Sequence, residues 1–329
     1  MPPCLRCRTN SNLHKDRRDN RGRTDKAFEL MDSVRTEQSW FVAEMIRVTT
    51  DMWQKGWDER NGGNVSLRLT AEDVAPYLSS WKKTRVRKLV EPVDGLDGEY
   101  FLVTGTGAYF RNVEREPEEN LGVIRVLPGG DAVEILWGFG ESGGPTSELP
   151  AHLKSHYASQ HRGGEPKRVI MHCHATNLVS LSYVLELTTE NVTRALWEGS
   201  TECLVVFPDG IGTLDWMVPG TDSIGDATAA LLAHHPLALW PFHGVFAAGT
   251  TLNEAFGLID TVEKASELLV KIIAMGGARQ TISTQNLIDL ARHFGVTPLP
   301  SALALNGWRL APSPAEKPRK EAAILGAVR

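Results

Sequence analysis

The stretch Arg168-Val-Ile-Met-His-Cys-His-Ala-Thr-Asn177 places two histidines on either side of one cysteine. The apolar residues 169–171 before them predict a buried strand. Side chains two positions apart on a strand point to the same face, so the imidazoles of His172 and His174 would converge while Cys173 points away. Two converging imidazoles are half of a metal site, because imidazole is a common ligand of Zn²⁺ and related ions.

A third ligand is expected from His243, in the segment Leu237-Ala-Leu-Trp-Pro-Phe-His-Gly-Val-Phe246. It follows an apolar run that predicts a strand, and Gly244 after it permits a close approach of the backbone. A His-x-His pair with one distant histidine is the ligand set of zinc sites that keep a position open for water or substrate. Such sites are catalytic, so the pattern predicts an enzyme.

Glu148 is the predicted proton-transfer partner of this metal site. It lies in Pro145-Thr-Ser-Glu-Leu-Pro150, where a helix over residues 148–157 is expected with Thr146 or Ser147 as its N-cap. A carboxylate in that first turn can be held near a metal–substrate complex and take a proton from it. The alternative is an acidic residue favoured only by the helix dipole.

The same helix offers a competing metal site. Glu148 and His152 lie four residues apart on one face, and His156 extends the stripe. Three such residues are compatible with metal binding, but they also fit a solvated or capping face.

Three short segments combine glycine with small hydrogen-bonding residues: Asn61–Asn64, Thr104–Gly107 and Thr146–Ser147. Glycine lets backbone N–H groups approach an anion, and hydroxyls add donors. The third segment also opens a helix, where the dipole favours anions. None has the P-loop or Rossmann spacing, so each alone is compatible with a simple turn. Beside a three-histidine metal set, they indicate a small phosphorylated substrate.

The composition is that of a globular protein, with 329 residues, 42% of them hydrophobic and 23% charged. The net charge of −5 gives no case for nucleic-acid binding, and no apolar run approaches the roughly 20 residues of a membrane helix. The four cysteines do not form a disulfide framework. Cys4 and Cys7 have the spacing of half a zinc knuckle without a second pair, and the simpler interpretation is reduced thiols in a cytoplasmic protein.

One domain is predicted over residues 34–306, because no linker or repeat interrupts it. Residues 1–33 are polar and Arg-rich and predict a disordered tail or a start codon assigned too early, and residues 307–329 predict a loose tail. The alternation of elements predicts a sheet covered by helices on both faces. Helices are expected over 38–55, 148–157, 177–185 and 252–275, and strands over 65–69, 101–103, 169–173, 204–207 and 237–240.

These residues resemble the class II aldolase/adducin family from about residue 38 to residue 305. The resemblance rests on long segments that include Ser39–Phe41, Gly56–Asn64, Pro145–His152, Met171–Asn177, Leu196–Cys203 and Trp240–Phe246. It implies an α/β fold, with three α/β/α layers around a central, largely antiparallel sheet.

The resemblance also implies a set of roles. His172, His174 and His243 would bind one Zn²⁺ per subunit, and Glu148 would be the catalytic acid/base. Glu202 would reach an active site across a subunit boundary, because relatives are cyclic homotetramers with active sites near their interfaces. The phosphate and hydroxyls of the substrate would be surrounded by Asn61, Gly63, Asn64, Thr106, Gly107, Thr146 and Ser147. Cys173 would be a packing residue.

The implied activity is zinc-dependent retro-aldol cleavage of a phosphorylated ketose, a carbon–carbon lyase reaction. The tryptophan-containing segments favour the branch that converts L-rhamnulose 1-phosphate to dihydroxyacetone phosphate and L-lactaldehyde in rhamnose breakdown. Ala108 stands where close relatives often carry Lys, which would weaken phosphate binding.

Other functions remain compatible with the sequence. The nearest are cleavage of L-fuculose 1-phosphate and 4-epimerisation of a pentulose 5-phosphate, which use the same metal chemistry. An adducin-like interaction module is more distant, because such relatives typically lack the histidine set. A zinc hydrolase fits the histidines alone, but nothing beyond the metal builds an acyl-transfer site.

Overall fold

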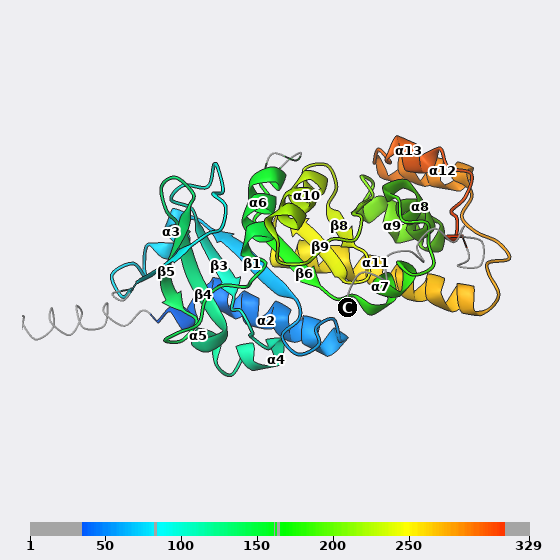
Figure 1. The fold of residues 1–329 in the computed structure, drawn as a ribbon. Coiled ribbons are helices and arrows are strands. Elements are labelled where there is room, and N and C mark those ends of the chain that lie inside the picture. Colours follow the sequence, from blue (N-terminus) through cyan, green and yellow to red (C-terminus); the bar gives the residue numbers. More distant parts are fainter. Residues whose placement is uncertain (1–34, 82–83, 161, 163–164, 313–329) are drawn as a thin grey trace, which may run out of the picture.

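A mixed sheet of nine strands organises the computed structural model, which describes residues 35–81, 84–160, 162 and 165–312 (Figure 1). In spatial order the strands are β2 (Arg85–Lys88), β5 (Ala132–Gly138), β4 (Leu121–Val126), β3 (Tyr100–Thr104), β1 (Asn64–Leu69), β6 (Val169–Cys173), β9 (Gly244–Gly249), β8 (Leu237–Trp240) and β7 (Ile211–Thr213). Neighbouring strands are antiparallel except β7 and β8, which are parallel.

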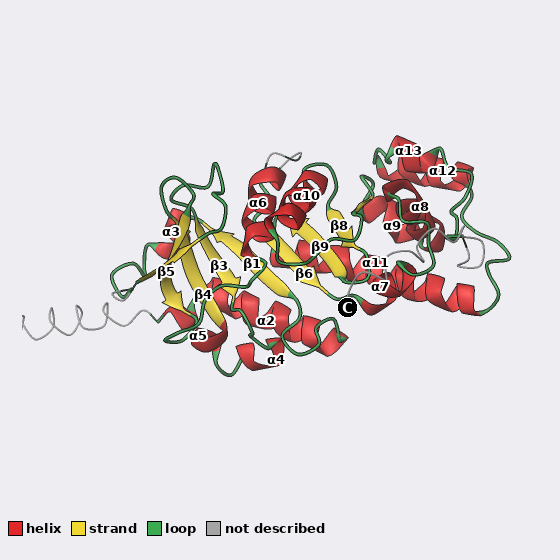
Figure 2. Cartoon of the chain, in the orientation of Figure 1, coloured by secondary structure: helices red, strands yellow, loops and turns green. Residues whose placement is uncertain are grey.

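Helices cover both faces of this sheet, so the predicted three-layer α/β/α fold is confirmed (Figure 2). One face packs against α2 (Trp40–Lys55), α7 (Thr176–Leu181), α8 (Thr189–Gly199) and α11 (Leu252–Ala274). The other face packs against α6 (Leu149–Ser159) and α10 (Asp222–Leu232). Shorter elements are η1 (Thr36–Gln38), α3 (Ala71–Val74), α4 (Phe110–Val113), α5 (Pro117–Asn120), α9 (Thr201–Val206), α12 (Thr284–Phe294) and α13 (Pro300–Leu303).

The central strand β6 is buried along its whole length because helices lie on both sides of it. Its alternating side chains divide between the two cores. Met171 and Cys173 pack toward α2 and α11, whereas Ile170 packs with Phe246 on the side of α6 and α10. Burial raises the pKa of the Cys173 thiol well above its usual value, as expected of a neutral packing residue.

The predicted strand over residues 204–207 is wrong, because this segment belongs mainly to helix α9. Cys203 and Leu204 are buried there in the core beside α8 and α11. A short apolar run fits a buried strand and a buried helix equally well, and only the packing decides between them. The helix predicted over residues 177–185 is shorter than expected and ends at Leu181.

The predicted N-terminal tail, with Cys4 and Cys7, lies outside the described residues, as do residues 313–329. Within the described start of the C-terminal segment, the carbonyl of Arg309 accepts from the backbone N–H of Glu186, and Ala311 donates to Val184. The limits of the predicted domain stay a prediction.

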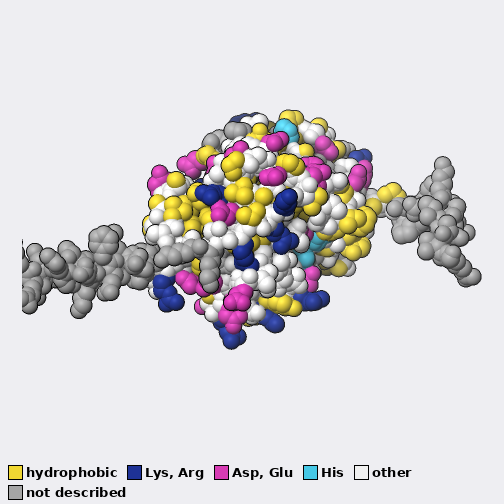
Figure 3. All heavy atoms as spheres, turned by 60° about the vertical axis from the view of Figure 1, so that its left-hand side comes forward, with side chains coloured by type: hydrophobic (Ala, Val, Ile, Leu, Met, Phe, Trp, Pro, Cys, Tyr) yellow, Lys and Arg dark blue, Asp and Glu magenta, His cyan; other side chains and the backbone are white. Residues whose placement is uncertain are grey.

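Two observations on the described residues concern possible membrane spans and the character of the surface. No helix in it is long and apolar enough to cross a membrane. Acidic, basic and apolar side chains lie side by side on the face shown in Figure 3.

A buried carboxylate ties the segment after β6 to the long helix α11. Glu263 accepts hydrogen bonds from the backbone N–H and side-chain amide of Asn177, at 2.9 and 2.8 Å, and from the backbone N–H of Leu178 at 3.0 Å. The first N–H groups of a helix have no hydrogen-bond acceptor within the helix. The Glu263 carboxylate is the acceptor for two of these N–H groups in α7. This fixes the chain directly after His174.

Replacing this carboxylate should destabilise the fold. We expect Glu263→Ala to lower the free energy of unfolding by about 1–3 kcal/mol, because buried N–H groups lose their acceptor. Urea unfolding would measure it. Glu267→Ala, one turn along α11, is the matched control, because Glu267 pairs only with Lys264 and Lys271 on the surface. Equal losses in both variants would contradict the anchoring role.

Candidate active site

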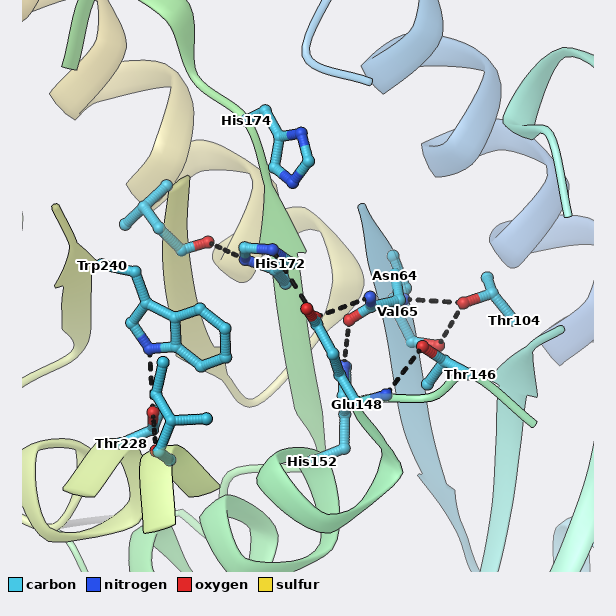
Figure 4. Close-up of polar contacts among 12 residues, drawn as sticks. Asn64, Val65, Thr104, Thr146, Glu148, His152, His172, His174, Thr228 and Trp240 are labelled. Carbon is cyan, nitrogen blue, oxygen red and sulfur yellow. Dashed lines mark hydrogen bonds and ion pairs between the residues drawn. The ribbon is translucent and has the colours of Figure 1, made fainter. Parts of the chain in front are cut away.

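Three histidines from two parts of the sheet meet at one point. His172 ends β6, His174 follows it, and His243 lies in the turn between β8 and β9. Their ligand nitrogens all lie within 4.8 Å of one another. The structure thus brings together the three residues that the sequence grouped, and Figure 4 shows the rings of His172 and His174 near each other.

Hydrogen bonds orient two of these rings. His172 donates from Nδ1 to the carbonyl of Val245 at 3.1 Å, which leaves its Nε2 buried without a partner. His174 uses its Nδ1 for Glu59, at 2.7 Å from Oε2. Nδ1 of His243 is buried and also unpartnered. Unpartnered buried nitrogens are rare in proteins and fit a metal ligand set.

Burial favours the neutral, metal-binding form of two of the three imidazoles, those of His172 and His243. Burial, with His174 and His243 close by, holds the pKa of His172 well below its usual value. Burial and His174 lower the pKa of His243 to about 4. A neutral imidazole needs no proton removed before it can bind a cation.

Two glycines leave the space that the histidine rings occupy, because a side chain at either position would collide with a ring. A Cβ on Gly62 would lie 2.9 Å from the His174 ring, and a Cβ on Gly244 would lie 2.8 Å from Cε1 of His172. The predicted close approach at Gly244 is therefore confirmed. In the same turn Phe242 has a φ of 63°, an uncommon conformation for a non-glycine residue, and its N–H donates to Ser182. This turn directs His243 toward the other two histidines.

Glu148 lies beside the cluster. Its Oε2 is 3.6 Å from Nε2 of His172 and accepts a hydrogen bond from the side chain of Asn64 at 2.9 Å (Figure 4). Burial raises the pKa of Glu148, and the bond from Asn64 opposes that rise. A carboxyl group with a raised pKa can both hold and release a proton nearer to neutral pH.

The predicted N-cap of α6 is wrong. The helix begins at Leu149, and Glu148 itself occupies the N-cap position in place of Thr146 or Ser147. Thr146 instead accepts from the backbone N–H of Glu148 at 3.2 Å. The carboxylate is left free of capping bonds and can point toward the histidines.

The residues predicted to bind phosphate come together in part. Asn64 lies opposite His172 in the β1–β6 pairing. The segments around Thr106 and Thr146 pair with each other, because Thr106 donates to Gly144 and Thr146 donates to Thr104. Gly63, Asn64 and Thr146 are buried, whereas the exposed members are Asn61, Thr106, Gly107 and Ser147.

Glu202 lies on α9, which packs with α8, α11 and α12 near the β7 end of the sheet (Figure 1). Its side chain is exposed and accepts a hydrogen bond from Ser200 at 2.9 Å. The contacts of the described residues do not place it with the three histidines. Its role across a subunit boundary stays a prediction.

The predicted solvated face of α6 is wrong. His152 and His156 are completely buried against the sheet, where both rings contact Ser66. They also lie outside the three-histidine cluster.

Glu59 is a site residue that the sequence did not single out. Burial would raise its pKa, but the hydrogen bond with His174 and the nearby imidazoles lower it overall. A carboxylate that accepts from a ligand histidine fixes the ring and strengthens its metal bond. The one hint to Glu59 in the sequence is its position three residues before Gly62, the glycine that packs on the same His174 ring.

The chain belongs to the class II aldolase and adducin family, because the model of the Class II Aldolase and Adducin N-terminal domain matches residues 43–270. It is therefore an enzyme of a metal-dependent class, a carbon–carbon lyase that catalyses retro-aldol cleavage, and its histidine cluster can bind a metal.

Individual relatives are similar over nearly their whole length. The rhamnulose-1-phosphate aldolase of Pectobacterium atrosepticum is 59% identical over 266 residues, 80% of this chain and 97% of that protein. The enzyme of the same name from Yersinia pseudotuberculosis is 57% identical over the same shares. A solved sugar-phosphate aldolase from Thermotoga maritima is 30% identical, with a TM-score of 0.62, covering 72% of this chain and 96% of that one.

Loss of the Glu59 carboxylate should weaken metal binding without unfolding the protein. We expect Glu59→Gln to lower the affinity for a divalent metal by about 10- to 100-fold. Competition with a chromogenic chelator would measure it. Glu44→Gln, a partly exposed residue of α2 that pairs with Arg47, serves as the control, and equal affinities in the two variants would exclude the role.

Proposed function

We propose that this protein cleaves L-rhamnulose 1-phosphate to dihydroxyacetone phosphate and L-lactaldehyde, with Zn²⁺ held by His172, His174 and His243. The observation that carries the proposal is the cluster of three imidazoles with the Glu148 carboxyl beside it. The names of the two similar rhamnulose-1-phosphate aldolases support the choice of substrate.

The donor set favours zinc. Among the residues that the structure describes, three imidazole nitrogens form the ligand group with no thiolate or fourth ligand in it, which is the set of catalytic zinc sites that keep one position open. When bound, Zn²⁺ would supply a Lewis acid that stabilises the negative charge developing on the substrate oxygens.

The side chains of the protein must then manage protons. In the cleavage, the C4 hydroxyl releases its proton to the solvent, the C3–C4 bond breaks, and its electron pair moves toward the C2 carbonyl. C3 of the resulting enediolate finally takes a proton. We assign the delivery of that proton to Glu148, which is buried, has a raised pKa and is held in place by Asn64.

Binding of the substrate phosphate and hydroxyls is assigned to the glycine-rich segments. Buried Asn64 and Thr146 would contact the substrate from the floor of the site, and the exposed members would close around the phosphate. They are Asn61, Thr106, Gly107 and Ser147, with Gly63 allowing the backbone to approach. Ala108 supplies no cation, so the phosphate would depend on N–H and O–H donors.

We also propose that the protein works as a homotetramer in the cytoplasm, with active sites near its interfaces. The exposed position of Glu202 on α9 supports a role for this carboxylate in the site of a neighbouring subunit.

Replacement of Glu148 should separate chemistry from metal binding. We expect Glu148→Gln to retain zinc while kcat falls by about 10²- to 10⁴-fold, because the amide cannot transfer the proton. His172→Ala should lose the zinc itself. Bound zinc and release of dihydroxyacetone phosphate are the two measurements. Glu141→Gln, in the exposed loop before the site, is the control, and full activity of Glu148→Gln would refute the assigned role.

The substrate can be decided by parallel assays. We expect L-rhamnulose 1-phosphate to be cleaved with a higher kcat/KM than L-fuculose 1-phosphate, and no epimerisation of a pentulose 5-phosphate. A chelator should abolish cleavage and added Zn²⁺ should restore it. Faster cleavage of the fuculose substrate would reassign the substrate, and cleavage that survives chelation would exclude the metal.

A further inference from the structure

A series of hydrogen bonds runs beneath the site, from the middle of α6 to Glu148. Nε2 of His156 lies 2.8 Å from Oγ of Ser66, which lies 2.7 Å from Nδ1 of His152. Nε2 of His152 contacts Oδ1 of Asn64, whose Nδ2 donates to Glu148. We call His156, Ser66, His152 and Asn64 the relay. Figure 4 shows its upper part, where His152 reaches up to the amide of Asn64.

The relay is uncharged and closed to water. His152 and His156 are 0% exposed, and they pack on the rings of Phe246 and Phe101. Burial lowers the pKa of His152 to about 3 and that of His156 well below its usual value. Polar groups in such surroundings cost free energy unless they are hydrogen-bonded, so an apolar pair would be the simpler way to fill this space.

The chemistry of the groups fixes the direction of every bond. Asn64 presents its amide nitrogen to Glu148 and its oxygen to His152, as it must whenever the Glu148 carboxylate is ionised and can only accept. His152 must then donate from Nε2 and accept at Nδ1 from the Ser66 hydroxyl. Ser66 has one proton, so it accepts from Nε2 of His156. All donors point toward Glu148, and the series ends at the unpartnered Nδ1 of His156.

We propose that His152 is a positioning residue, which acts through Asn64 to hold the Glu148 carboxyl beside His172. An amide has two orientations of nearly the same shape, and only one of them offers an N–H to Glu148. The Nε2–H of His152 selects that orientation, because the other would face two donors toward each other. The inference rests on the proposed role of Glu148 in proton transfer.

Two replacements of His152 separate positioning from packing. A glutamine amide reaches about as far as Nε2 and can still donate to Asn64, whereas an asparagine amide reaches only about as far as Nδ1. We expect kcat for L-rhamnulose 1-phosphate to be about 10- to 100-fold lower in His152→Asn than in His152→Gln, at equal zinc content. Equal kcat values would overturn the proposal. His293→Asn, exposed on α12, is the control.

A double-mutant cycle tests the route of the effect. In a Glu148→Gln background, the difference between His152→Asn and His152→Gln should disappear, because the carboxyl that His152 positions is gone. A difference that persists in this background would show that His152 acts elsewhere and would overturn the proposal. If His152→Asn does not fold, Ser66→Ala takes its place in the cycle, since it removes the hydroxyl that donates to His152.

The bond directions can be tested without any substrate. Nitrogen-15 NMR of the imidazole rings should find both His152 and His156 as neutral Nε2–H tautomers. A proton on Nδ1 of His152 would overturn the proposal even in an active enzyme. Absence of cleavage by the wild-type protein, with both tautomers as expected, would instead reject the proposed function and leave the relay standing.

Discussion

The pairing of β1, β6 and β9 determines where the groups of the site can lie. Its antiparallel register sets Asn64 opposite His172, and His172 opposite Phe246. Opposed residues share a face of the sheet, so the amide, the imidazole and the phenyl ring lie in one row. The Phe246 and His172 rings are stacked with their centroids 4.3 Å apart, and Glu148, the N-cap of α6, contacts Asn64 and His172. A slip of one residue would bury His172 in the opposite core and turn Cys173 toward α6.

The groups outside this row are held by longer-range contacts. His174 lies just past the end of β6, where its backbone donates to Trp57 and the following helix depends on Glu263 of α11. His243 comes from a turn with a left-handed residue at Phe242. The site is therefore built from a regular sheet row with irregular segments at its edge, as in many enzymes whose reactive groups lie on loops.

Much of this could be predicted from the sequence where the pattern is local. The strands over residues 169–173 and 237–240 match β6 and β8, because a short apolar run in a covered sheet carries its own signal. The grouping of the three histidines could be predicted because His172 and His174 have the same-face spacing of a strand and because a glycine follows His243. The predicted catalytic and phosphate-binding roles remain predictions, since geometry alone does not test them.

The failures have a common physical cause. The apolar run over residues 204–207 is too short to distinguish the strand period from the helix period, and its packing against α8 and α11 favours a helix. The polar face of α6 was predicted to be solvated because a sequence shows that side chains are polar but not what they pack against. In the structure this face packs against polar side chains of the sheet, Ser66 and Asn64. Glu59 was not singled out beyond its nearness to Gly62, since a carboxylate 115 positions from its histidine is brought to it by the fold.

The two glycines that pack on the imidazole rings have a thermodynamic consequence. With Gly62 and Gly244 packed against them and both of their Nδ1 atoms hydrogen-bonded, the rings of His172 and His174 have little rotamer freedom before any cation arrives. Ordering a side chain costs conformational entropy, so a site whose ligands are already ordered gives up little of it on binding. Selectivity among cations then comes from how well each ion fits a rigid opening, rather than from how far the ligands can adjust.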